Sequence, residues 1–120
     1  MINQYEVAAY LADELPEING NLKKITPALN VFKSIQCLSD YTRNKVMQHD
    51  LRVVKKCFEI ADNIYFRGNG LVRDAIENVF VYSFSSLFNL TDRKEKKELQ
   101  ALVPMCLYTA YVHQVFKSGI

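Results

Sequence analysis

Several residue types that define common protein classes are scarce in this chain of 120 residues. It has no tryptophan, four glycines, three prolines and three cysteines. So few glycines and prolines argue against a fold of many short strands joined by tight turns. The three cysteines cannot all pair with one another, and each lies among apolar neighbours. We therefore expect reduced thiols in the core of a cytoplasmic protein.

The net charge and the lengths of the uncharged runs argue against three further classes of protein: polyanion-binding, exported and membrane-spanning proteins. The formal net charge of +2 is too small to indicate a polyanionic partner by itself. Residues 1–15 carry acidic side chains where a signal peptide would need an apolar core, so we expect no export. The apolar run 78–90 has 13 residues, fewer than the roughly 17–25 that span a bilayer. We therefore expect no membrane segment.

The spacing of apolar residues predicts the fold class. They recur at intervals of three and four along nearly the whole chain, which is the period of amphipathic helices. Residues 79–84 are β-branched and aromatic and would also suit a strand, but a lone strand would have no partner. We expect an all-α, compact bundle of five or six helices in a single domain, residues 1–120. The predicted helices cover residues 3–15, 26–45, 50–67, 71–88, 91–103 and 104–116.

Local signals indicate where these helices begin and end. Three side chains suit a helix cap, and one of them precedes a proline at the first helical position. The expected caps are Thr26 (followed by Pro27), Asp50 and Thr91. Gly68 or Gly70 is expected to take a left-handed conformation and to end the third helix. The last helix is expected to bury the stripe Tyr108, Tyr111, Val112 and Val115.

The fourth predicted helix is the most unusual segment of the sequence. From residue 79 to residue 90 it carries no charge and only four polar side chains, so it must be buried in its own fold or against a partner. One orientation turns Val79, Ser83 and Ser86 toward the core. The candidate partner-binding residues are then Val81, Phe84 and Phe88 on another flank. In the alternative, the first and last helices cover both flanks and this helix is central.

Residues for catalysis or metal binding are not indicated by the sequence. The two histidines, His49 and His113, have no metal ligand at a recognised spacing. The serines in 83–86 lack the G-x-S-x-G turn that exposes a nucleophile. We therefore expect no catalytic, cofactor-binding or metal-binding residues.

Two groups of basic residues lie apart in the sequence. The first, in the turn at 43–56, is Arg43, Lys45, His49, Arg52, Lys55 and Lys56. The second is Arg93, Lys94, Lys96 and Lys97. Acidic residues interrupt both groups, whereas nucleic acid needs a continuous positive face. Nucleic acid is therefore not the expected partner, and weak binding through the basic turn stays an alternative.

Residues 64–83 carry a motif of two helices joined by a glycine turn. It reads I-Y-x-x-G-N followed by x-x-V-x-x-A-I-E-N-V-F-V-Y-S. This text resembles an uncharacterised family of small all-helical bacterial proteins and is distantly similar to immunity-type proteins, which neutralise a toxin. The resemblance implies no catalytic residues. One departure is the charge, because immunity proteins that bind cationic nucleases are usually acidic.

These observations favour binding over catalysis. We expect a non-enzymatic bacterial protein–protein interaction module in the cytoplasm that is either immunity-like or homodimeric, with another protein or a second copy as partner. The alternative from a different class is a small-molecule-binding helical domain with a cavity lined by tyrosine and cysteine.

Overall fold

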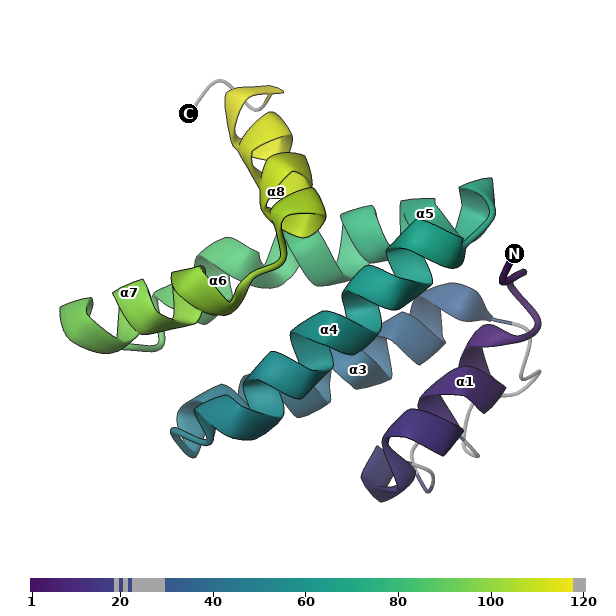
Figure 1. Cartoon of the computed structure of the whole chain (residues 1–120), viewed down its shortest axis with the longest axis horizontal. Helices are drawn as coiled ribbons and strands as arrows, with labels where there is room; N and C mark the ends of the chain where they lie inside the picture. The colour runs from purple at the N-terminus through teal and green to yellow at the C-terminus, as the bar shows by residue number, and fades with distance from the viewer. Residues whose placement is uncertain (19, 21, 23–29, 118–120) are drawn as a thin grey trace.

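The computed structural model describes residues 1–18, 20, 22 and 30–117, and its regular structure is helical (Figure 1). Its elements in chain order are α1 (Val7–Glu14), the 3-10 turn η1 (Pro16–Ile18), α3 (Val31–Met47), α4 (Leu51–Arg67), α5 (Gly70–Ala75), the π-helical turn η2 (Ile76–Phe80), the 3-10 turn η3 (Val81–Ser83), α6 (Phe84–Phe88), α7 (Arg93–Leu102) and α8 (Met105–Lys117). The predicted all-α bundle is confirmed.

Side-chain caps begin the two longest helices. Asp50 accepts a hydrogen bond from the backbone N–H of Val53, so the predicted start of α4 is confirmed. Asn30 accepts from the backbone N–H of Lys33 and begins α3 in the same way. These bonds satisfy amides that have no partner inside the helix. The predicted helix start at residues 26 and 27 lies outside the described residues.

The cap of α7 is Asp92. The cap predicted from the sequence, Thr91, is therefore wrong. Asp92 accepts from the backbone N–H of Glu95 at 2.8 Å. The hydroxyl of Thr91 instead donates to the carbonyl of Phe88 at 2.9 Å and so closes the end of α6. A carboxylate also complements the positive end of the helix dipole, which favours Asp92 at this position.

Gly68 allows α4 and α5 to approach each other closely, and it does not end α4 in a left-handed conformation. Its φ of −78° and ψ of 153° are extended, and no left-handed φ occurs at Gly70 either. The predicted left-handed glycine is therefore wrong. A Cβ at Gly68 would lie 2.5 Å from Cγ1 of Val72 and 2.6 Å from the carbonyl oxygen of Ile64. Only glycine lets the chain pass between α4 and α5 at this distance.

The N-terminal segment pairs with the same turn. The backbone N–H of Ile2 donates to the carbonyl of Arg67 at 2.6 Å, and Asn69 donates back to Ile2 at 2.9 Å. The side chain of Asn3 then accepts from two following backbone N–H groups and turns the chain. The first helix therefore begins at Val7, four residues after the predicted start, because the preceding backbone is used in this pairing and turn.

Residues 70–88 form one continuous helical segment, here called the central rod, which consists of α5, η2, η3 and α6. The single helix predicted over 71–88 is thereby confirmed. Five buried side chains follow one another at every fourth residue: Val72, Ile76, Phe80, Phe84 and Phe88. At 3.6 residues per turn this series would wind around an α-helix. The wider π-helical turn η2 takes up part of this excess, and the tighter 3-10 turn η3 follows it. The series therefore meets α4 on one flank of the rod and α8 on the other.

Aromatic rings join the rod to its neighbours. The ring of Phe58 in α4 meets those of Phe80 and Phe84 edge-on, with centroid distances of 6.0 and 5.7 Å. From α8, Tyr111 approaches Phe84 at 5.8 Å and Phe88 at 5.6 Å. Each such pair adds about 0.5–1.5 kcal/mol beyond the burial of apolar area. The rod is thus the centre of the core, between α3 and α4 on one flank and α8 on the other.

The molecule is thin in one direction. Its extents are 39 × 31 × 20 Å, and the shortest of these matches two layers of helices about 10 Å in diameter. In a two-layer arrangement most helices keep one side in water. Figure 1 shows that α8 crosses the rod and stands apart from α1, α3 and α4. Within the described residues, no helix combines the length and the apolar character needed to cross a bilayer.

Candidate interaction surface

The three residues predicted to bind a partner lie in the core. Val81, Phe84 and Phe88 are 0%, 0% and 2% exposed. The rod is oriented differently from the expected way, because Ser86 faces solvent and Val79 and Ser83 are half-buried. The aromatic side chains face α4 and α8. These three residues are therefore not accessible to a partner. The alternative of a central helix holds, although α3 and α4 cover the flank that the first helix was expected to cover.

A different apolar surface is exposed, and it lies on α8. This helix buries Leu107 and Ala110, and Gln114 donates to the carbonyl of Glu77 in η2 at 2.7 Å. These contacts turn the opposite side of α8 outward. We call this side the outer face; it consists of Met105, Tyr108, Thr109, Val112, His113 and Phe116.

The outer face exposes three large apolar side chains to water. Met105 is 78%, Phe116 77% and Tyr108 37% exposed. The expectation that Tyr108 and Val112 point into the core is wrong for Tyr108, and Val112 is half-buried. Elsewhere in the described chain, no element carries more than two exposed large apolar side chains, although Met1, Tyr5, Phe66 and Leu71 come from two segments that pair at the α4–α5 turn. Single exposed apolar residues are normal in a protein surface, whereas a contiguous group indicates an interaction site.

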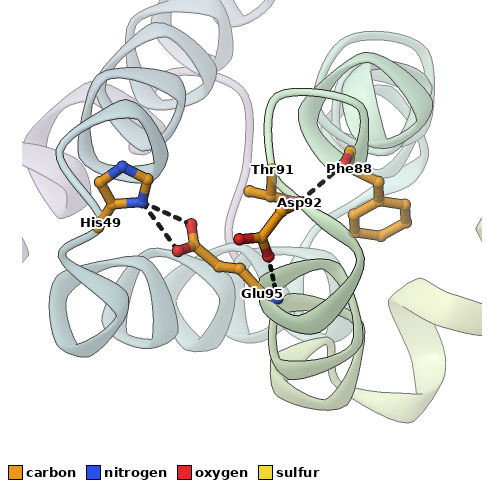
Figure 2. A network of polar contacts seen from close by, with 5 residues as sticks. All are labelled: His49, Phe88, Thr91, Asp92 and Glu95. Atoms are coloured by element: carbon orange, nitrogen blue, oxygen red, sulfur yellow. Dashed lines mark hydrogen bonds and ion pairs between the residues drawn. The ribbon is translucent and has the colours of Figure 1, made fainter.

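The segments that carry the two basic groups come into contact in the fold through an acidic residue. His49, in the turn between α3 and α4, meets Glu95 of α7 through Nδ1 at 2.8 Å (Figure 2). Two of the three acidic residues that interrupt the groups have structural partners: Asp50 caps α4 and Glu95 binds His49. The third, Glu98, is exposed.

The first basic group does not lie on a single side of the molecule. Tyr41 donates a hydrogen bond to Glu17, and this bond lowers the pKa of Glu17, with Lys56 and Lys45 adding to the effect. Those two lysines therefore lie near enough to Glu17 of η1 for their charges to act on it. The ammonium of Lys45 also lies 5.4 Å from the ring centre of Tyr41. The basic turn at 43–56 is thus divided between two surfaces, which weakens it as a nucleic-acid site.

The cysteines differ in their surroundings. All three are free: Cys57 is buried, Cys37 half-buried and Cys106 exposed. The prediction of core thiols is therefore wrong for Cys106, which lies on the solvent side of α8. Burial raises the pKa of Cys57 to about 11, so this thiol stays protonated and inert. No group of three potential metal ligands occurs among the described residues.

A cleft lies between α6, α7 and α8, and Tyr111 lines it together with five other residues. The expected lining of tyrosine and cysteine is right for tyrosine at this cleft but wrong for cysteine, because no cysteine is among the lining residues.

One family matches the chain over nearly its full length. The domain of unknown function DUF7674 matches residues 8–117. The chain belongs to the DUF7674 family. The match includes α1 apart from Val7, the central rod and all of α8, and the glycine-turn motif at 64–83 lies inside it. No curated protein and no solved structure matches the chain. The resemblance to an uncharacterised helical family is confirmed.

Proposed function

We propose that this chain is a non-enzymatic protein–protein interaction module that pairs with a second copy of itself through the outer face of α8. The observation that carries the proposal is the exposure of Met105, Tyr108 and Phe116 on one side of a helix at the edge of the fold. Residues at these spacings share a helix face. Burying them would remove a contiguous apolar group from water, which favours association.

The outer face is complementary to itself when two copies of α8 run antiparallel. A two-fold axis between positions 110 and 111 sets Met105 against Phe116 of the second copy, and Tyr108 against His113 of the second copy. A methionine sulfur beside an aromatic ring is a favourable contact, and a tyrosine hydroxyl can bond to imidazole. A two-fold interface requires this kind of self-complementarity.

Charge favours the antiparallel orientation over the parallel one. Lys117 is the only lysine or arginine of α8 and lies at its end. Parallel helices would place the two copies of Lys117 side by side, whereas antiparallel helices separate them by nearly the helix length, about 20 Å. Because one helix face is a small interface, we expect a dissociation constant of about 10–100 μM.

Sedimentation analysis of the whole chain tests this proposal. Over about 5–500 μM, the wild-type chain should shift from monomer to dimer. The variant Met105→Glu/Phe116→Glu should stay monomeric, because it places charges in the apolar contact. Tyr82→Glu is the matched control, since Tyr82 is 76% exposed but lies outside α8, and it should dimerise like the wild type. A monomeric wild type, or a dimer that the α8 substitutions leave unchanged, would contradict the proposal.

A second candidate follows from the resemblance at 64–83, namely immunity-like binding of a toxin in the bacterial cytoplasm. The three free cysteines favour a reducing compartment. With a net charge of +2, this role would require a toxin with an acidic surface. Dimerisation through α8 would cover the outer face and favour the first candidate.

A further inference from the structure

The cleft between α6, α7 and α8 has a polar lining that the proposed function does not use. It is an open cleft of about 200 Å³, and its lining residues are Ser85, Phe88, Asn89, Lys96, Gln100 and Tyr111. Since one water occupies about 30 Å³ of the liquid, this volume holds about seven waters and suits a molecule of about seven or eight non-hydrogen atoms. Phe88 supplies apolar surface, and the other five side chains bring hydrogen-bonding groups to one place.

The hydroxyls of Ser85 and Tyr111 are held together. Their oxygens lie 3.0 Å apart, so one hydroxyl donates to the other. The accepting hydroxyl keeps its own proton, which it can donate to a ligand. Within the described chain, the side-chain amides of Asn89 and Gln100 have no hydrogen-bond partner. Each amide therefore offers two further N–H donors at the cleft.

Lys96 is the charged group of the cleft. Its side chain is half-buried, and no carboxylate is among the lining residues. The ion pair that involves α7 in the described residues is His49–Glu95, on the side of the helix that faces α4. The ammonium of Lys96 thus lies beside neutral donors without a protein counter-charge, an arrangement that attracts an anion.

We propose that this cleft binds a small organic monocarboxylate. One ammonium balances one carboxylate charge, and the neutral N–H and O–H donors can bond to the two carboxylate oxygens and to a second polar group. A phosphate group carries a charge of about −1.5 to −2 at pH 7 and would leave part of that charge unbalanced here. The site is independent of α8 pairing, because Tyr111 lies on the inner side of α8.

Titration of the 15N-labelled full-length chain with N-acetylglycine, followed by NMR, tests the inference. We expect saturable shifts of the side-chain amide signals of Asn89 and Gln100, with a dissociation constant of about 1 mM. N-acetylglycinamide, which has the same size without the charge, should cause no such shifts. Inorganic phosphate should bind more weakly than N-acetylglycine.

A matched pair of variants tests whether the ammonium of Lys96 is the charge that binds the carboxylate. Lys96→Gln should weaken N-acetylglycine binding about tenfold, because it removes a charge-assisted hydrogen bond. Lys97→Gln makes the same change in net charge on the exposed side of α7 and should bind like the wild type. The inference is overturned if N-acetylglycine leaves both amide signals unshifted, if the uncharged amide or phosphate binds as well, or if the two variants bind alike.

Discussion

His49 and Glu95 tie the turn between α3 and α4 to the first turn of α7. They are 46 residues apart in sequence, and Nδ1 of His49 lies 2.8 Å from Oε2 of Glu95. The carboxylate of Glu95 is 18% exposed, whereas the imidazole is 67% exposed. The backbone N–H of Glu95 is at the same time bound by Asp92 (Figure 2). His49 makes this contact from a left-handed backbone with φ of 59°.

Substitution at His49 should separate the backbone strain from the ion pair. Both His49→Ala and His49→Gly remove the contact, but only glycine adopts a left-handed φ without cost. We therefore expect the alanine variant to be less stable than the glycine variant by about 1 kcal/mol. Urea unfolding measures this difference, which should persist when Glu95 is replaced by glutamine. Equal stabilities of the two variants would show that the turn relaxes and stores no strain.

Phe84→Ala should destabilise the fold by about 3–5 kcal/mol, since it leaves a large cavity where rings from α4 and α8 meet. Phe84 is 0% exposed and contacts Phe58, Phe80 and Tyr111. Ser86→Ala, two residues away and exposed, is the control and should change stability by less than about 0.5 kcal/mol. Thermal and urea unfolding compare the two. A small loss at Phe84 would mean that the rod is not the core of this chain.

The two glycines of the α4–α5 turn should respond to alanine in opposite directions. At Gly68 the new Cβ would meet Val72 and the carbonyl of Ile64, and overpacking of this kind costs about 1–3 kcal/mol. At Gly70, the first residue of α5, nothing lies within 4 Å of the new atom. Alanine there should stabilise by about 0.5–1 kcal/mol, because it restricts the unfolded chain and favours helix. Differential scanning calorimetry measures whether each substitution raises or lowers the stability of the fold. A stabilising change at Gly68 would refute the close approach of α4 and α5.

The Tyr41–Glu17 hydrogen bond should make stability depend on pH in a defined direction. Tyr41 donates to Oε2 of Glu17 at 2.7 Å, and this bond lowers the pKa of the carboxyl from its ordinary value of 4.5. A carboxyl whose pKa is lowered by folding stabilises the native state above its unfolded pKa. That contribution disappears as the pH falls through the folded pKa.

Tyr41→Phe should therefore cost up to about 1 kcal/mol at neutral pH, a small value because water screens the exposed carboxylate. The cost should shrink as the pH falls from neutral through the lowered pKa of the Glu17 carboxyl, so it should be smaller at acidic than at neutral pH. Tyr5→Phe serves as the control, since Tyr5 is 57% exposed. Urea unfolding at both pH values measures the effect. A loss that is the same at both values would point to packing and not to the hydrogen bond.

Local sequence patterns determined the parts of this fold that depend on neighbours along the chain. The apolar stripes of residues 51–67 and the acceptor at Asp50 were sufficient to predict α4 with its start. The uncharged run after residue 78 was sufficient to predict a buried helix. Periodicity shows which residues share a helix face, because the residues three and four positions apart lie on one side in any α-helix.

Only the tertiary structure decided which face each helix buries. In the rod, Phe84 and Phe88 turn inward because rings from α4 and α8 meet them there, and Ser86 turns outward. The bond from Gln114 to Glu77 orients α8, which leaves Met105 and Phe116 in water. The cleft around Lys96 likewise joins residues of three helices. Burial depends on contacts between residues far apart in sequence, and a helical period carries no information about which distant side chains will cover it.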